Sequence, residues 1–284
     1  MLRPGLMARA RPAAAAGSPR EGKAPLLPCN AEIGTQRGFV CTSVALAEVK
    51  RIKNHFDVSI NDVVLALTAS TMRRYLLVHG GVPQEPARVN MAVSLRNDDD
   101  SAASNAITSV NVCLHTDKPD PLERLKAIHG ETDVAKRMAR ASQSSMYDPM
   151  NSLPPFALAL LNRAIRPEMV LAMMKCNFVV SNVKGSSVAM YLAGVRIEAI
   201  YPISLLANGM GLNFTCVSYV DHIDFGITHD QELVPNAWQI ADGLHDAARE
   251  YLRLAGPAKA SRKAVKPPRG RRMATRSGGS TRTR

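Results

Sequence analysis

The chain has 284 residues, of which 46% are apolar, and it carries a formal net charge of +12. This length fits one large domain or two small ones, and the apolar content is ample for a packed core. The charge is concentrated at the ends: residues 256–284 hold ten basic and no acidic residues, residues 1–23 are net +4, and residues 24–255 are net −2. The near-neutral centre therefore lacks the basic surface that is typical of nucleic-acid-binding folds.

Both ends are predicted to be disordered, as an Ala/Arg-rich leader over residues 1–23 and a basic tail over residues 256–284. The leader lacks the apolar core of a signal peptide. The tail could touch nucleic acid or an anionic membrane, but no aromatic residue interleaves its charges, which favours a solvated tail. No apolar run approaches the roughly 18–20 residues of a membrane-spanning helix.

The five cysteines are scattered, odd in number and without a CxxC pair. This pattern argues for reduced cytosolic thiols and against a disulfide framework or a zinc site. The seven histidines show no metal-type spacing such as HExxH. Serine-hydrolase elbows, phosphate loops and dinucleotide fingerprints are also absent from the sequence. We therefore predict neither a metal nor a resident cofactor.

Taken in chain order, the first clear elements are helical. A short amphipathic helix is predicted over residues 44–55, and Ser59 is a suitable N-cap for a second helix, with Asp62 near its positive end. Apolar residues along one face continue this helix until Gly80 and Gly81 end it.

Strands and helices then alternate along the rest of the chain. An Asp-Pro helix start at Asp120 predicts a helix to about Ala141, and a final helix is expected over residues 236–253. The two strands at 212–220 and 223–228 form a hairpin around Asp221-His222. The other predicted segments are strands at 88–95, 105–115, 177–183 and about 190–200, and a broken helical stretch at 153–174. This order predicts an α+β fold, or a layered sheet with helices on one face.

One pair resembles catalytic chemistry. Residues 129–133 read HGETD, and a His followed four positions later by Asp is the base motif of some acyltransferases. However, His129 and Asp133 fall within the predicted amphipathic helix, no second His precedes them, and no Gly follows. A solvated helical His beside an exposed carboxylate explains the pair better than a general base does.

Seven longer segments carry another pattern, and the region that they mark, from residue 24 onward, spans about 230 residues. In chain order they are APLLPCNAEIGTQRGF (24–39), INDVVLA (60–66), MAVSLR (91–96), SNAITSVNVCLHTDKPDPLERLKAI (104–128), FVVSNVKGS (178–186), YPISLLANGMGLNFTCVSYVDHIDFGITHD (201–230) and LVPNAW (233–238). Through these segments, residues 24–255 resemble the C-terminal region of the bacterial wax ester synthase/acyl-CoA:diacylglycerol acyltransferase family.

The resemblance implies one lobe of a two-lobed enzyme, with a chloramphenicol-acetyltransferase-like mixed β-sheet and packed helices. Between the lobes, a tunnel would hold acyl-CoA, as co-substrate, and a lipid alcohol or diacylglycerol. The family's catalytic motif is His-His-x-x-x-Asp-Gly on the N-terminal lobe, and this sequence contains no His-His pair. The resemblance therefore implies a C-terminal lobe of an O-acyltransferase for triacylglycerol or wax ester synthesis, inactive alone. The chain could be a truncated or frameshifted product, or could need a separately encoded N-terminal lobe.

The resemblance also implies residues that line the tunnel or support the site: Asn61, Asp62, Ser181, Asn182, Gly185, Gly209, Gly211 and Asn213. Each has a purely structural alternative as well. Asn61 and Asp62 lie in a helix's first turn, Ser181 and Asn182 end a strand, and the glycines allow tight turns. Where the family usually has prolines, Lys184 and Ser186 make the turn after Asn182 looser and more polar.

Two further expectations concern the whole protein. A non-catalytic acyl-binding, lipid-binding or scaffolding protein derived from the same family is the alternative function, and an active enzyme that uses His129 is a weaker one. We expect a cytoplasmic location, either free or peripheral to the inner membrane or lipid inclusions. The face that would meet a second lobe should be apolar and exposed, and it should favour self-association.

Overall fold

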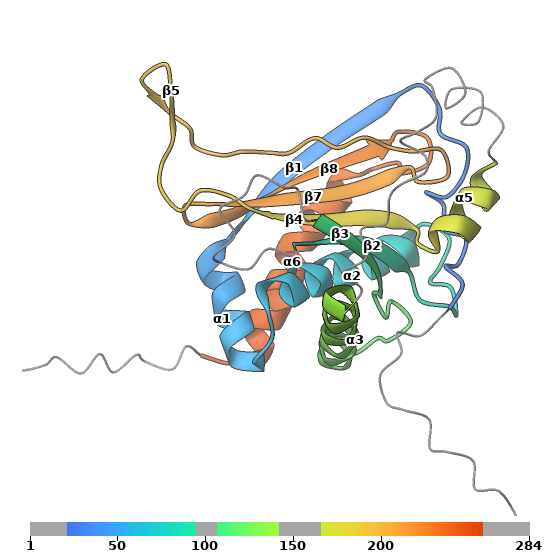
Figure 1. The fold of residues 1–284 in the computed structure, drawn as a ribbon, viewed down its shortest axis with the longest axis horizontal. Coiled ribbons are helices and arrows are strands. Elements are labelled where there is room, and N and C mark those ends of the chain that lie inside the picture. The colour runs from blue at the N-terminus through green and yellow to red at the C-terminus, as the bar shows by residue number, and fades with distance from the viewer. Residues whose placement is uncertain (1–21, 95–106, 142–165, 258–284) are drawn as a thin grey trace, which may run out of the picture.

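The computed structural model describes residues 22–94, 107–141 and 166–257. Nearly all of the predicted leader and tail, and the first part of the predicted helical stretch at 153–174, lie outside these residues. The described chain forms a six-stranded mixed sheet in the order β1-β8-β7-β4-β2-β3, with helices packed on one face (Figure 1). This confirms the α+β fold with a mixed sheet that the sequence predicts.

The sheet combines local hairpins with two parallel central pairs. β7 pairs antiparallel with β8, and β2 with β3, whereas β4 lies parallel to both β7 and β2. The strands are β1 (Arg37–Ala45), β2 (Arg88–Ser94), β3 (Ile107–Cys113), β4 (Phe178–Lys184), β7 (Leu212–Tyr219) and β8 (His222–Asp230). A separate two-stranded hairpin, β5 (Tyr191–Leu192) and β6 (Val195–Arg196), projects beyond the sheet in Figure 1.

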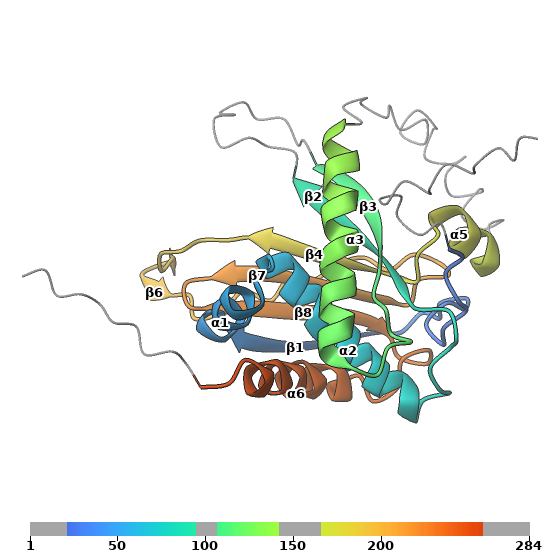
Figure 2. The ribbon, with the colours of Figure 1, turned by 90° about the horizontal axis from the view of Figure 1, so that it is seen from below.

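The helices cover the sheet in an order that does not follow the sequence. Figure 2 shows α3 crossing the β2–β3 end of the sheet, α6 running along the β1 side, and α2 between them. The helices are α1 (Leu46–Phe56), α2 (Ile60–Val78), α3 (Pro121–Ala141), α5 (Pro167–Met174) and α6 (Trp238–Leu254). Within the described residues, no helix combines the length and the apolar character that crossing a membrane would require.

The central helix α2 begins as predicted but is more deeply buried than predicted. The Ser59 hydroxyl accepts a hydrogen bond from the Asp62 amide, and the Asp62 carboxylate accepts one from the Ser59 amide, which completes a capping box. The sequence predicts one apolar face, yet every residue from Asp62 to Met72 is buried. Small residues in this stretch let α1, α3, α6 and the sheet approach the helix from several sides.

Two strand predictions were wrong. β1 was missed because its sequence, RGFVCTSVA, mixes polar and apolar residues without clean alternation, and its pairing with the distant strand β8 is not visible in the sequence. The strand predicted over about 190–200 is instead the short β5–β6 hairpin followed by an irregular segment. Apolar side chains are frequent there, but they remain exposed.

This irregular segment, residues 197–208, crosses the sheet on the face opposite the helices (Figure 1), and we call it the strap. Its backbone is held to the sheet: the Ile200 amide donates to Asp224, and the Ser204 amide donates to the Thr228 hydroxyl. Gly226 faces the strap with no side chain, because a Cβ there would meet the Pro202 carbonyl oxygen. We call this side of the sheet the open face.

Candidate functional site

The structure divides the predicted site residues among three places. β4 and β7 are parallel, so both strands start at one end of the sheet and finish at the opposite end, roughly 20 Å away for strands of this length. The residues at the ends, beside the start of α2, are Asn61, Asp62, Asn182 and Gly185. Gly209 and Gly211 lie before the start of β7, whereas Ser181 and Asn213 lie on strands and face the open side.

Asn61 and Asn182 meet between α2 and the sheet. The Asn182 amide donates to Asn61 Oδ1 (3.4 Å), and the Asn61 amide donates to the sulfur of Met91 (2.7 Å). The buried Cys216 thiol donates to Asn182 Oδ1 (3.4 Å). These contacts fix the Asn182 side chain on the helix side of β4, whereas successive strand residues point to opposite faces, so Ser181 lies on the open face.

A hollow of about 370 Å³ lies beside Asn182, and we call it the β4-end pocket. Lys50 and Lys184 supply positive charge, and Ser186, Ser187 and Ser218 supply hydroxyl groups. Leu46, Ile60, Asn182, Gly185 and Val220 complete its lining. No carboxylate, imidazole or thiol is among these lining residues, so the pocket is suited to an anion and has no acid–base group of its own.

Gly185 is required where the chain leaves β4 at this pocket. Its amide donates to the Ser218 hydroxyl (3.2 Å), and a Cβ would collide with the Ser218 carbonyl oxygen and approach Val217 Cγ2 to 2.7 Å. The close backbone approach therefore depends on the absence of a side chain. The looser, more polar turn expected from Lys184 and Ser186 is open to solvent on the Lys184 side.

Asp62 is fully buried and its carboxylate has several donors. Oδ1 accepts from the Thr132 hydroxyl (2.6 Å), and Oδ2 accepts from the Ser59 amide (2.8 Å) and contacts His129 Nδ1 (2.9 Å). Lys136 Nζ lies 3.7 Å from Oδ1. Burial opposes ionisation, but the hydrogen bonds and the Lys136 charge outweigh it and lower the pKa of Asp62. The carboxylate thus joins α2 to α3 and is not available as a base.

His129 lies on α3, as the sequence predicts, but it is not simply solvated. Its Nδ1 contacts Asp62, its Nε2 lies 3.6 Å from Asp133 Oδ2, and the side chain is 36% exposed. Both ring nitrogens therefore face carboxylates. The sequence missed the contact with Asp62 because 67 residues separate the two positions along the chain. His129 does not line the β4-end pocket.

Gly209 and Gly211 lie in a buried junction at the other edge of the sheet. Asn30 donates to the carbonyls of Gly209 (2.8 Å) and Asn177 (2.7 Å), and the Gly211 amide donates to Cys29 O (2.8 Å). Gly209 has φ +78°, and a Cβ there would lie 2.9 Å from the Pro167 carbonyl oxygen. Asn30 lies within the segment 24–39 that carries part of the family resemblance, but its distant partners could not be predicted from the sequence.

The open face presents a row of buried polar side chains beneath the strap. Asn213 Oδ1 accepts from the Thr215 hydroxyl (2.9 Å), which also pairs with the Ser204 hydroxyl of the strap (2.5 Å). Ser181 is the register partner of Thr215 on the neighbouring strand. Ser181 and Asn213 therefore share a face of the sheet that Asn61, Asp62 and Asn182 do not share.

Comparison with known protein families identifies this arrangement. Residues 103–251 match the sequence model of the WS/DGAT C-terminal domain, which is more than half of the chain. The chain belongs to this family. Residues 4–64 also match the wax ester synthase/diacylglycerol acyltransferase catalytic domain, a match that begins inside the predicted leader.

Curated relatives of this WS/DGAT-family chain come from several bacteria. It is 31% identical over 230 residues to a Mycobacterium tuberculosis protein named as a candidate diacylglycerol O-acyltransferase, covering 81% of this chain and 46% of the relative. It is 32% identical over 225 residues to the O-acyltransferase WSD of Acinetobacter baylyi, covering 79% and 48%. The chain thus spans about half the length of the curated relatives it matches.

Solved structures agree on the fold. The wax ester synthase/diacylglycerol acyltransferase from Marinobacter aquaeolei VT8 superposes with a TM-score of 0.67 at 27% identity, covering 82% of this chain and 53% of that one. A condensation domain from the enacyloxin polyketide synthase superposes with a TM-score of 0.53 at 15% identity, which shows a shared fold.

Proposed function

We propose that this chain provides the C-terminal lobe of an O-acyltransferase that moves a long-chain acyl group from CoA to a lipid alcohol or diacylglycerol. The observation that carries the proposal is the match of residues 103–251 to the WS/DGAT C-terminal domain, together with a sheet that superposes on a wax ester synthase. The His-His-x-x-x-Asp-Gly motif would come from residues outside these 284, because no two histidines are adjacent in this sequence.

The chemistry of the described residues supports a role in binding and not in proton transfer. A hydroxyl acceptor needs a general base within about 3 Å when it attacks the thioester. Asp62 is buried, its pKa is lowered, and its oxygens already contact donors from Ser59, Thr132, His129 and Lys136. His129 lies between the Asp62 and Asp133 carboxylates. Neither group lines the β4-end pocket. We therefore propose that the isolated chain does not form esters.

The β4-end pocket supports a role for this lobe in holding the phosphates of CoA. Two lysines and three serines line it, without a competing carboxylate among the lining residues. Lysine ammonium groups and hydroxyls are ordinary ligands of phosphate oxygens, each charge-assisted bond being roughly twice as strong as a neutral one. The volume of about 370 Å³ fits part of such a ligand.

The open face supports packing against a second lobe. Ser204 of the strap points to the sheet, whereas its neighbours Ile203 (74% exposed) and Leu205 (93% exposed) point away from it. Val183 on the same face is 49% exposed. We call Val183, Ile203, Leu205 and the β5–β6 residues Tyr191, Leu192 and Val195 the open-face apolar surface. Exposed apolar side chains of this number support an interface, or a contact with lipid inclusions or the inner membrane.

The same two observations favour one alternative. A lobe with an anion pocket and an apolar surface, but no base, could serve as a non-catalytic acyl-binding or scaffolding protein. The two functions differ in whether ester formation appears when a catalytic half is supplied.

The experiment is an acyl-transfer assay with palmitoyl-CoA and either dodecanol or diacylglycerol. Purified chain is assayed alone, and then with the separately expressed N-terminal half of the Marinobacter enzyme. Turnover only in the mixture supports the proposed lobe. Binding of acyl-CoA without turnover in any mixture supports the non-catalytic alternative. Turnover by the chain alone that is lost in His129→Ala would contradict both.

The pocket is tested separately by calorimetric titration with CoA. Lys50→Gln and Lys184→Gln should each weaken binding by about tenfold, the size of one lost charge-assisted contact. Lys126→Gln, an exposed lysine on α3 away from the pocket, is the matched control and should leave CoA affinity unchanged. If Lys50→Gln and Lys184→Gln bind CoA as tightly as Lys126→Gln does, the pocket does not hold the phosphates of CoA.

A further inference from the structure

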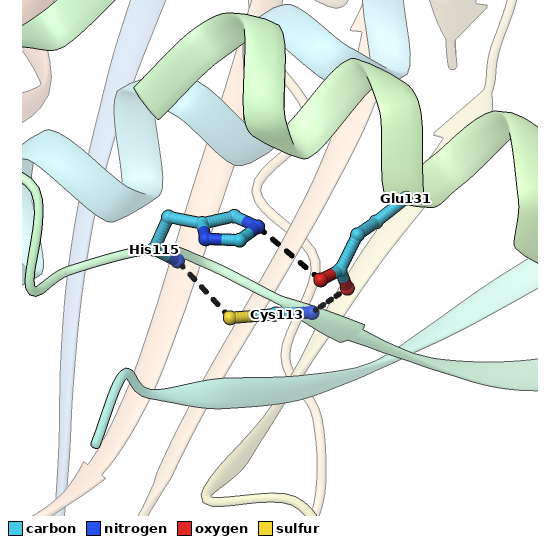
Figure 3. A group of neighbouring side chains, drawn as sticks. All are labelled: Cys113, His115 and Glu131. Carbon is cyan, nitrogen blue, oxygen red and sulfur yellow. Dashed lines mark hydrogen bonds and ion pairs between the residues drawn. The ribbon is translucent and has the colours of Figure 1, made fainter. Parts of the chain in front are cut away.

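A second group of chemically active side chains lies away from the β4-end pocket, where β3 ends beneath α3 (Figure 3). Cys113 is the last residue of β3, His115 follows two residues later, and Glu131 projects from α3. One ligand atom from each residue, the thiol sulfur, a ring nitrogen and a carboxylate oxygen, lies within 4.8 Å of the other two.

Hydrogen bonds hold the backbone of this cluster in place. Glu131 Oε2 accepts from the Cys113 amide (3.0 Å), and Cys113 Sγ accepts from the His115 amide (3.4 Å). His115 adopts the left-handed region, with φ +49°, which is uncommon for a residue other than glycine. The turn after β3 is therefore built so that the imidazole stays beside the strand's last thiol and the helix's carboxylate.

The imidazole is buried but poorly satisfied. The side chains of His115 and Glu131 are only 6% and 13% exposed, and His115 Nε2 lies 3.2 Å from Glu131 Oε1. That approach lacks hydrogen-bond alignment, and within the described residues neither ring nitrogen has a hydrogen-bond partner. Buried polar atoms are nearly always hydrogen-bonded, so a buried imidazole whose only close polar contact is the Glu131 ion pair, beside a third possible ligand, indicates a further binding partner.

The three donor atoms match a particular class of ion. Thiolate, imidazole and carboxylate together are typical ligands of zinc and of similar transition metals, whereas Mg²⁺ and Ca²⁺ take oxygen ligands. With bonds of about 2.0–2.3 Å, a tetrahedral zinc ion needs its ligand atoms roughly 3.3–3.8 Å apart. The atoms here are separated by 3.2 Å to at most 4.8 Å, so shifts of roughly 1 Å would complete the geometry.

We propose that Cys113, His115 and Glu131 form a mononuclear site for Zn²⁺ or a similar divalent transition-metal ion, with the fourth position open to water. Binding releases the thiol proton and any proton on His115, and the resulting thiolate and carboxylate balance the dication. Arg88, which is buried, is the cross-strand neighbour of Cys113. The ion would join β3 to α3, the helix whose Thr132 and His129 contact Asp62 of α2.

Sequence spacing could not reveal this site. Cys113 and His115 form a C-x-H pair that belongs to no common zinc pattern, and Glu131 is supplied by a helix 16 residues further on. The prediction that the cysteines form no zinc site considered linear spacing alone. The fold supplies the third ligand.

Cobalt spectroscopy on the purified 284-residue chain tests the site without any assay of acyl transfer. Protein is treated with a chelator, dialysed, and titrated with Co²⁺ in place of the spectroscopically silent Zn²⁺. We expect saturation near one ion per chain, intense visible bands from four-coordinate cobalt, and a sulfur-to-cobalt charge-transfer band in the near ultraviolet. Zn²⁺ at about 100 times its dissociation constant should raise the melting temperature by roughly 5–10 °C.

Matched variants assign the ligands. Cys113→Ser should lose the charge-transfer band, and Glu131→Gln should reduce Co²⁺ affinity at least tenfold, whereas Cys29→Ser, another buried thiol, should keep both signals. Since the unmodified chain alone carries the main readout, a variant that fails to fold does not leave the question open. No stoichiometric Co²⁺ uptake and no charge-transfer band in the unmodified chain would overturn the proposal and leave a buried His115–Glu131 ion pair.

Discussion

The Asp62 network gives the most quantitative prediction, through Asp62→Asn. Asparagine keeps the shape of the side chain but removes its charge and replaces one acceptor oxygen with a donor. The carboxylate now accepts from the Thr132 hydroxyl at 2.6 Å and from the Ser59 amide at 2.8 Å, and it also contacts His129 and Lys136. The substitution removes the negative charge from these bonds and contacts, and the Thr132 hydroxyl can then accept from the new amide only by donating to the His129 carbonyl, 3.0 Å away.

The magnitude follows from how exposed each partner is. A hydrogen bond to a buried charge contributes about 1.5–3 kcal/mol, whereas a partly exposed ion pair contributes about 0.5 kcal/mol. His129 and Lys136 are 36% and 25% exposed, so their share takes the smaller figure. We therefore expect Asp62→Asn to lower the free energy of unfolding by about 3 kcal/mol, a large part of a typical domain's total stability.

Urea unfolding followed by circular dichroism measures this loss. Asp133→Asn is the matched control, because Asp133 contacts the same histidine but is 50% exposed, and its loss should cost under about 0.5 kcal/mol. If both variants lose the same stability, the buried network does not join α2 to α3 as described.

The pH dependence has a definite sign. The pKa of Asp62 is lowered from its ordinary value of 3.8, because its donors outweigh the opposing effect of burial. A lowered folded-state pKa contributes stability that is fully present above the unfolded value and is lost as the pH falls through the folded value. The difference in free energy of unfolding between the unmodified chain and Asp62→Asn should therefore be constant above about pH 5 and become smaller below about pH 4. A gap that widens with acid would contradict this assignment.

Four further substitutions test other parts of the structure. Gly226→Ala should displace the strap and lower the free energy of unfolding by about 1–3 kcal/mol, whereas Gly130→Ala, mid-helix with nothing within 4 Å, should raise it by about 0.5–1 kcal/mol; urea unfolding compares the pair. Tyr251→Phe should cost about 1 kcal/mol in the same assay, because its hydroxyl donates to the Pro121 carbonyl at 3.0 Å; an unchanged midpoint would argue against that bond. Leu205→Asp should leave unfolding by urea unchanged, since this side chain is 93% exposed, but should reduce ester formation in the two-half assay and self-association by ultracentrifugation.

Local chemistry explains why much of the fold was predictable. The capping box at Ser59, the Asp120 cap of α3 and the Asp221-His222 hairpin each depend on residues within a few positions of one another. Such signals need no knowledge of the rest of the chain. The α+β fold followed from the order of these elements.

The remaining features depend on contacts between distant segments. β1 is a strand because it pairs with β8, almost 190 residues away, and its own sequence does not indicate that. Asn30 reaches the Gly209 carbonyl across 179 positions, and His129 reaches Asp62 across 67. The candidate site shares this limit: the motifs indicated Asn182 and Gly185, but Lys50, which lies on α1, joined the pocket only through the fold.

The central proposal is that this chain binds substrate while a separate N-terminal half supplies the catalytic histidine. It is tested most directly by measuring ester formation in three preparations. These are the isolated chain, the chain mixed with a catalytic N-terminal half, and the chain mixed with that half after its motif histidines are changed to alanine. We expect turnover only in the second preparation. Sustained turnover by the isolated chain, or by the mixture without motif histidines, would contradict the account.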